Sequence, residues 1–233
     1  ANKKWLRIAA MLVVVLTSTF LVKNLILDKG FVIEKTANNE TKTIQLPDGS
    51  QVTMNAMSRV EFATKDFEAN RSLTLEGEAF FEVEKGSQFS VVVDDLRVEV
   101  LGTSFNVYSR DEQKEVNCLS GKVKVALGEN QIILTQGQGV VAKDSVLPMA
   151  ASSFDEAEVM GWQKGKFVFS EALLSKVITA LEVQYGVSVE NAPKTPRYYS
   201  GYFEKGNLEQ AARQVFVPMG LEYVISGEQI MIK

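Results

Sequence analysis

Residues 72–84 read SLTLEGEAFFEVE, and this stretch decides the class of fold. Apolar or small residues stand at every second position from Leu73 to Val83, and polar residues fill the positions between them. A period of two is typical of a β-strand with one buried face. Phe80 interrupts the polar face, and we interpret it as a bend in the strand. The alternative is an exposed aromatic ring that is available to a partner.

The residues around this strand, 31–146, repeat the pattern of strand, turn and strand. Turn signals such as Asp48-Gly49, Leu101-Gly102 and Ser120-Gly121 separate runs rich in Val, Leu, Thr and Phe, and no helical spacing of apolar residues competes. The sequence therefore predicts a mainly β protein with an all-β domain at residues 31–146.

The tail, residues 162–233, contains a repeat. Residues 167–169 (FVF) predict a strand, and Ser170 followed by Glu171 predicts a helix start. The two helical apolar faces that follow are offset by 34 residues: Leu174, Val177, Ile178 and Leu181, then Leu208, Ala211, Ala212 and Val215. Two copies with one helix each disfavour a helical solenoid. We expect a small α/β module of two β-α-β units, joined to the all-β domain by a linker at residues 147–161.

The N-terminus predicts a membrane anchor at residues 1–27. Residues 8–27 are almost wholly apolar, and 20 helical residues reach about 30 Å, the thickness of a hydrocarbon core. A cleaved signal peptide would show a small-x-small site, and a buried core helix would show one polar face; neither is present. Lys3, Lys4 and Arg7 favour a cytoplasmic N-terminus. We expect a single-pass inner-membrane protein whose C-terminal bulk lies in the periplasm.

Composition excludes much enzyme chemistry. The 233 residues contain no histidine and only one cysteine, Cys118, so there is no Ser-His-Asp triad, internal disulfide or thiolate zinc site. After residue 27 the chain has 21 basic and 29 acidic residues, a net charge of −8, which disfavours nucleic-acid binding. No metal-ligand cluster or cofactor motif stands out, and we expect no cofactor. Cys118 is interpreted as a small core residue.

Glu76 and Glu78 are the one candidate pair for carbohydrate chemistry, because glycoside hydrolysis uses paired carboxylates. They lie two residues apart on the polar face of one strand. We therefore interpret both as part of a solvated face, and a carbohydrate-active envelope enzyme is the weaker alternative.

Several longer motifs resemble the FecR-type anti-sigma factors. They are LPDGS at 46–50 with Asn55, Ala56 and Ser58, RSLTLEGEAFFEV at 71–83, VEVLGTSFNV at 98–107, LSGKV at 119–123 and Gly137-Gln138. Trp162, Gly165, Phe167, Phe169 and Tyr185-Gly186-Val187 resemble the C-terminal domain of the Bacteroidetes-type members.

The resemblance implies a solenoid-like or sandwich all-β FecR domain, followed by a domain like the secretin and TonB short N-terminal fold. It also implies a regulator that relays the state of a TonB-dependent outer-membrane transporter, through the transporter's N-terminal signalling domain, to an extracytoplasmic-function sigma factor. The chain begins with Ala1, and we expect a fragment that lacks the cytoplasmic sigma-binding segment. A structural, self-assembling envelope module with a secretin-like domain is the alternative.

Two sets of candidate site residues follow from the resemblance and the sequence together. Some FecR-type proteins cleave themselves at a Gly-Thr bond, which corresponds here to Gly102-Thr103; we favour an ordinary glycine bend and expect no other catalysis. Tyr198, Tyr199, Tyr202 and Phe203 form an aromatic cluster near a predicted free sheet edge, where a transporter strand could add. Tyr199 and Phe203 are alternatively core residues of one strand.

Overall fold

The computed structural model describes residues 17–18, 30–111 and 113–233. Within these residues, no helix is long and apolar enough to cross a membrane. The predicted span at residues 8–27 lies outside the described part of the chain except for Thr17 and Ser18.

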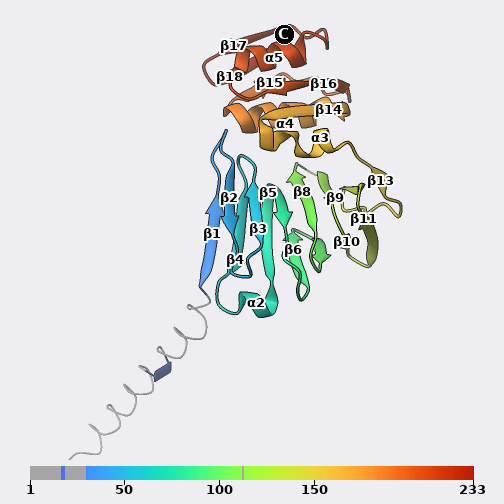
Figure 1. Cartoon of the computed structure of the whole chain (residues 1–233). Coiled ribbons are helices and arrows are strands. Elements are labelled where there is room, and N and C mark those ends of the chain that lie inside the picture. The colour runs from blue at the N-terminus through green and yellow to red at the C-terminus, as the bar shows by residue number, and fades with distance from the viewer. Residues whose placement is uncertain (1–16, 19–29, 112) are drawn as a thin grey trace, which may run out of the picture.

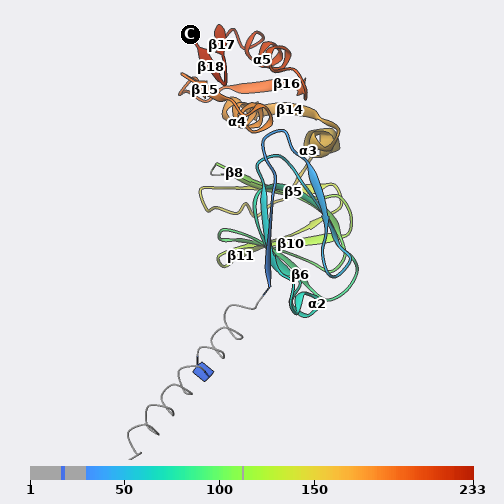
Figure 2. The ribbon, with the colours of Figure 1, turned by 90° about the vertical axis from the view of Figure 1, so that its left-hand side faces the viewer.

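Two sheets build the all-β domain, and the decisive strand β5 (Ser72–Glu82) belongs to both. The first sheet contains, in order, β1 (Phe31–Lys35), β4 (Arg59–Ala63), the first half of β5, β6 (Phe89–Val93), β7 (Leu96–Val100), β10 (Lys122–Leu127) and β11 (Asn130–Thr135). The second contains β2 (Lys42–Gln45), β3 (Gln51–Met54), the second half of β5, β8 (Ser104–Arg110), β9 (Gln113–Cys118), β12 (Gln138–Lys143) and β13 (Ser152–Ser153). Figures 1 and 2 show this domain from two directions.

Strand β5 changes sheets at Gly77. Residues 72–76 of β5 pair with β4 and β6, whereas residues 77–82 pair with β3 and β8. Gly77 has φ +94°, and a Cβ atom there would lie 2.9 Å from the Cα of Ser58. Only glycine combines this left-handed backbone with so close a neighbour. The expected bend at Phe80 is wrong, because Phe80 lies within the continuous strand.

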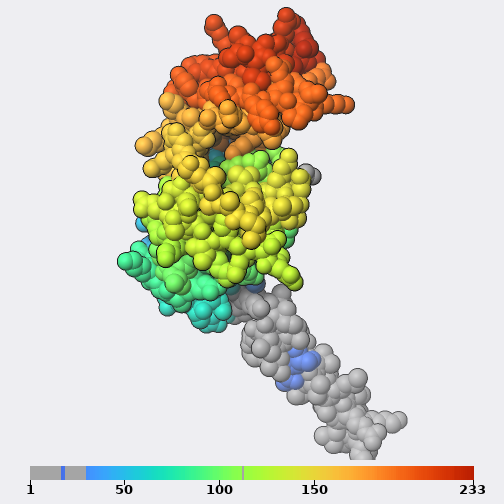
Figure 3. All heavy atoms as spheres, turned by 90° about the vertical axis from the view of Figure 1, so that its right-hand side faces the viewer, coloured from blue at the N-terminus to red at the C-terminus, as the bar shows by residue number. Residues whose placement is uncertain are grey.

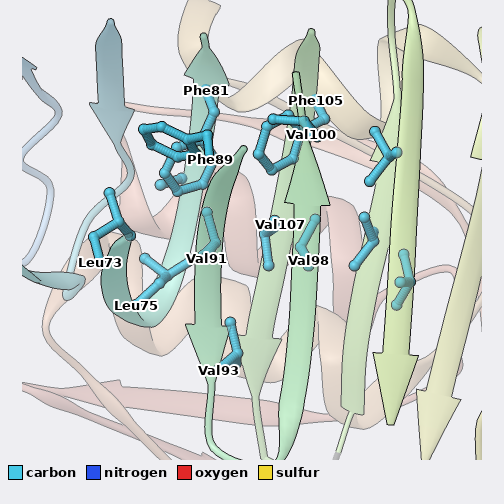
Figure 4. Packing of buried hydrophobic residues seen from close by; sticks show 14 of the residues in the cluster. Leu73, Leu75, Phe81, Phe89, Val91, Val93, Val98, Val100, Phe105 and Val107 are labelled. Atoms are coloured by element: carbon cyan, nitrogen blue, oxygen red, sulfur yellow. The ribbon is translucent and has the colours of Figure 1, made fainter. Parts of the chain in front are cut away.

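The predicted buried face of β5 is confirmed. Leu73, Leu75, Ala79, Phe81 and Val83 are all buried in the core of the all-β domain, and Figure 4 shows several of them packed against side chains of the neighbouring strands. Phe81 stacks on Phe105, with ring centroids 4.9 Å apart. Cys118 is also a buried core residue, as predicted. The core sits between the two sheets, as the alternation of apolar residues requires.

One short helix interrupts the strands, α2 (Phe67–Asn70), which the sequence analysis did not predict. Four residues are too few for a recognisable helical period, so only tertiary contact marks this turn. Phe67 anchors it by packing edge-on against Phe62 and Phe89.

The C-terminal module, residues 162–233, has the two predicted β-α-β units. The first comprises β14 (Lys166–Leu173), α4 (Leu174–Tyr185) and β15 (Ser188–Glu190), and the second comprises β16 (Tyr198–Glu204), α5 (Leu208–Phe216) and β17 (Tyr223–Ser226), before the final strand β18 (Gln229–Ile232). The opening strands of the two units pair with each other, β14 with β16, and β18 pairs with both β15 and β17. The helix start predicted at Ser170 is wrong: a bulge after Phe169 lets β14 continue to Leu173.

Residues 147–161 connect the two parts and have structure of their own. They contain β13, which pairs with β12, and α3 (Glu156–Met160), whose first turn is capped by the Asp155 carboxylate accepting from the amide of Ala157. A short 3₁₀ turn, η2 (Gly161–Lys164), leads from α3 toward β14 and carries the buried side chain of Trp162.

Candidate functional site at the joint between the two parts

Helix α4 contacts both parts of the molecule, because one of its faces packs in the C-terminal module and another contacts the all-β domain. Leu174, Val177, Ile178 and Leu181 are buried in the core of the C-terminal module, as the helical spacing predicts. A second face of α4 contacts the all-β domain. It has the spacing i, i+3, i+7, i+8 and comprises Lys176, Thr179, Val183 and Gln184. Figure 1 shows α4 directly above the ends of the all-β strands.

The contacts of this second face are polar. The Thr179 hydroxyl and the Asp111 carboxylate oxygen are 2.9 Å apart, and Lys176 forms an ion pair with Glu115. The Nδ2 of Asn38 donates to the carbonyl of Val183 at 3.1 Å and thereby satisfies one of the carbonyls in the last turn of the helix. Joints of this polar kind resemble transient interfaces, which separate more readily than apolar ones.

A buried polar network lies at the centre of the joint. Gln184 of α4 donates to the Oδ1 of Asn55 at 3.0 Å, and Asn55 in turn donates to the Glu78 carboxylate at 2.8 Å. Asn106 donates to the other oxygen of Glu78 at 3.0 Å. All four side chains are buried. The network therefore links the decisive strand β5 to helix α4 through a single intermediate residue.

Burial raises the pKa of the Glu78 carboxyl, and this effect exceeds the lowering by the Asn55 hydrogen bond, Arg110, Asn106 and Lys176. The phenol of Tyr108, which lies under Lys176 with 4.9 Å between the ammonium nitrogen and the ring centroid, also has a raised pKa because of burial. Perturbed groups that gather in one place mark a candidate functional site.

A cavity of about 640 Å³ opens beside this network. Its walls come from both parts of the molecule and from the connecting residues 147–161, and Figure 3 shows the surface hollowed where these segments meet. Glu78, Asn106 and Tyr108 line it from below, and Trp162, Phe167 and Gln184 line it from the C-terminal module.

The solvated-face interpretation of Glu76 and Glu78 is correct for one residue and wrong for the other. Glu76 is 68% exposed and pairs with Arg59 on the neighbouring strand, with 3.0 Å between nitrogen and oxygen. Glu78 is only 9% exposed, because the C-terminal module covers that end of β5. Phe80 is half-buried for the same reason and packs against the core of the C-terminal module, so its ring is occupied within the chain.

Gly102 and Thr103 lie away from the joint, between β7 and β8. Gly102 has φ +152°, and a Cβ there would lie 2.9 Å from the Cα of Lys85. Thr103 is buried, and its hydroxyl donates to the carbonyl of Lys122 at 3.1 Å. This is the geometry of a glycine where two chain segments approach closely. The favoured interpretation, an ordinary glycine bend, and the alternative, cleavage of the bond, are distinguished by the intact mass of the purified chain.

The aromatic cluster of β16 is divided between the two faces of the strand. Tyr199 and Phe203 are buried in the core of the C-terminal module, whereas Tyr198 and Tyr202 are 64% and 44% exposed. Lys166 lies over the ring of Tyr202, 4.6 Å from its centroid. Within the described residues β16 pairs only with β14, so its other edge has no strand partner there.

Sequence reasoning missed Asn106, Lys176 and Gln184. Gln184 stands three residues after Leu181, in the apolar register of α4, and a polar residue at such a position was the available signal. Asn106 lies between two apolar residues of β8, Phe105 and Val107, and is buried like both of them, with nothing in the local pattern to mark it.

Comparison with known proteins identifies relatives of both parts. Residues 33–124 match the family model described as "FecR protein". Two crystal structures of a "putative anti-sigma factor" from Parabacteroides distasonis, at 1.65 and 2.50 Å, are each 28% identical, with a TM-score of 0.79, over 87% of this chain and 98% of that one. No curated protein matches the sequence. Residues 31–146 make up only about half of the 233, so the likeness extends into the C-terminal module.

Proposed function

We propose that this chain, whose residues 33–124 match the family model described as "FecR protein", is the periplasmic sensing part of a membrane-anchored anti-sigma regulator. In this role it relays the state of a TonB-dependent outer-membrane transporter to an extracytoplasmic-function sigma factor. The observation that carries the proposal is the likeness to the "putative anti-sigma factor" over 87% of the chain, since it includes both the all-β domain and the C-terminal module.

The proposed entry point for the signal is the exposed side of β16. A strand with one unpaired edge accepts an added strand through backbone hydrogen bonds, and exposed aromatic side chains beside it favour an interface. Tyr198 and Tyr202 provide such side chains. The proposed path then runs through the C-terminal module to α4 and the polar joint.

The test is a pull-down from envelope extract of the source bacterium, with the full chain as bait and the bound proteins identified by mass. We expect a TonB-dependent transporter that carries an N-terminal signalling domain. Replacing Tyr198 and Tyr202 by serine should reduce its recovery. Met149→Ser is the control, because Met149 is an exposed apolar side chain, at 78% even more exposed than the two tyrosines, but lies in the connecting residues.

Three outcomes would contradict parts of this proposal. Undiminished recovery with the tyrosine variant would exclude β16 as the contact. Recovery of the chain alone, as a stable oligomer, would favour the structural envelope module instead. An unchanged level of sigma-dependent transcription after deletion of the gene would exclude the regulatory role. Protease accessibility of the C-terminal module in spheroplasts tests the proposed periplasmic location.

A further inference from the structure

The cavity at the joint has the size of a site for a small molecule. Its volume of about 640 Å³ lies within the range of about 300–1,000 Å³ that is usual for such sites. Because both parts of the molecule line it, a bound molecule would contact the all-β domain and the C-terminal module at once.

One corner of the cavity is rich in hydrogen-bond acceptors. The buried Glu78 carboxylate receives hydrogen bonds from the amides of Asn55 and Asn106. Within the described residues, no lysine or arginine forms an ion pair with it. The Oδ1 of Asn106 is buried and has no hydrogen-bond partner. Unsatisfied groups of this kind are rare in native proteins and call for an explanation.

The charges around the cavity are also unbalanced. Lys176 is paired with Glu115. The same lysine also lowers the pKa of both Glu78 and Glu158 through its charge. Arg110 lines the cavity as well and lowers the pKa of Glu78 more than Lys176 does, but its guanidinium donates to the carbonyls of Ala56 and Met57. The pKa values of Glu78 and Glu158 are both raised, chiefly by burial. A further positive charge would be stabilised here and a further negative charge would be repelled.

The opposite wall carries three aromatic rings beside polar groups: Glu158 and Glu171 also line it, and the buried Trp162 Nε1 has no hydrogen-bond partner among the described residues. Trp162, Phe167 and Phe169 of the C-terminal module line it, and all three belong to the core of that module. Their rings offer a rigid surface for an apolar group and a favourable environment for a nearby cation. The two walls together define a site with one end that favours a cation and one end that presents aromatic rings.

We infer that this cavity binds a small organic amine, with its ammonium group at the Glu78–Asn106 corner and its apolar body against Trp162, Phe167 and Phe169. The ammonium group supplies the hydrogen-bond donors and the positive charge that the corner lacks. This inference concerns the cavity alone and does not depend on the proposed transporter partner.

The experiment uses the full chain carrying Trp5→Phe, so that Trp162 is the single tryptophan and reports on the cavity by its fluorescence. The probes are three compounds of one shape and different charge: phenethylamine, 2-phenylethanol and 3-phenylpropionate. We expect saturable binding of phenethylamine, at least tenfold weaker binding of the alcohol, and none of the carboxylate. Isothermal titration calorimetry provides an independent affinity.

Variants locate the site. Glu78→Gln should weaken phenethylamine binding at least tenfold, whereas Glu76→Gln, two residues away on the exposed face of the same strand, should leave it unchanged. Ala180→Phe, which fills the cavity from α4, should abolish binding and remains informative if Glu78→Gln fails to fold. Absence of phenethylamine binding, equal binding of the alcohol, or full affinity in both Glu78→Gln and Ala180→Phe would each overturn the inference.

Discussion

At the scale of single residues, Gly77 is the position at which the fold is most sensitive. A side chain there meets both a left-handed backbone and the backbone of Ser58. We expect Gly77→Ala to lower the free energy of unfolding by about 3 kcal/mol. Left-handed backbone strain accounts for about 1–2 kcal/mol of this loss, and the contact of the new Cβ with the backbone of Ser58 accounts for the rest. Chemical denaturation measures the change.

The matched control for Gly77 is Gly137, which has a similar φ of +80° but open space around its Cβ position. Gly137→Ala should therefore show only the backbone strain, about 1–2 kcal/mol. Equal losses in the two variants would mean that the close approach of Ser58 contributes nothing.

Glu78 gives the protein a defined dependence of stability on pH. Its carboxyl pKa is raised by burial in the folded state above the ordinary 4.5, so the folded protein holds this proton more tightly than the unfolded chain. Its contribution to stability is complete below pH 4.5 and is lost as the pH rises through the raised pKa. The facing cations Arg110 and Lys176, and the amides of Asn55 and Asn106, reduce this effect without reversing it.

We therefore expect the free energy of unfolding of the wild type to fall relative to that of Glu78→Gln as the pH rises above 4.5. Urea denaturation across this pH range, with Glu76→Gln as the control, measures the difference. A constant difference between wild type and Glu78→Gln at all pH values would show that the Glu78 carboxyl has an ordinary pKa.

At the scale of elements, helix α4 holds the joint through its polar face. Gln184→Leu keeps the size of the side chain but removes the donor to Asn55, and a lost hydrogen bond of this kind costs about 1 kcal/mol. We expect faster amide hydrogen exchange in α4 and faster proteolysis of residues 147–161, with little change in β5. Ser175→Ala, on the exposed side of the same helix, is the control and should match the wild type.

The sequence predicted these elements well where a hydrophobic period continued over many residues. It predicted poorly the positions that contact both the all-β domain and the C-terminal module. The alternation of β5 and the repeat of two helical faces predicted the core correctly, because each side chain there has one environment. The sequence did not predict the burial of three residues, Glu78, Phe80 and Gln184. Their neighbours in space come from a part of the chain that lies far away in sequence. Burial at a joint between two domains leaves no local period.

At the scale of the whole molecule, the two hydrophobic cores are distinct. Phe105 is buried in the all-β domain and Phe203 in the C-terminal module, and a mainly polar joint lies between them. We expect two separable unfolding transitions in calorimetry. Phe105→Ala and Phe203→Ala should each remove about 3–5 kcal/mol from one transition and leave the other nearly unchanged. A single transition that both variants shift equally would show that the joint couples the cores tightly.

The positions of β1 and of the C-terminus determine how a pulling force would pass through the joint. Strand β1 begins at one end of the molecule and the C-terminus lies at the other, so tension between them passes through the all-β domain, the joint and the C-terminal module in series (Figure 1). The five paired residues of β1 and β4 share such a load, because β1 is pulled along its length. The polar contacts of α4 with the all-β domain are separate from one another, and we expect them to break one at a time. We therefore expect the joint to separate under tension while both cores stay folded.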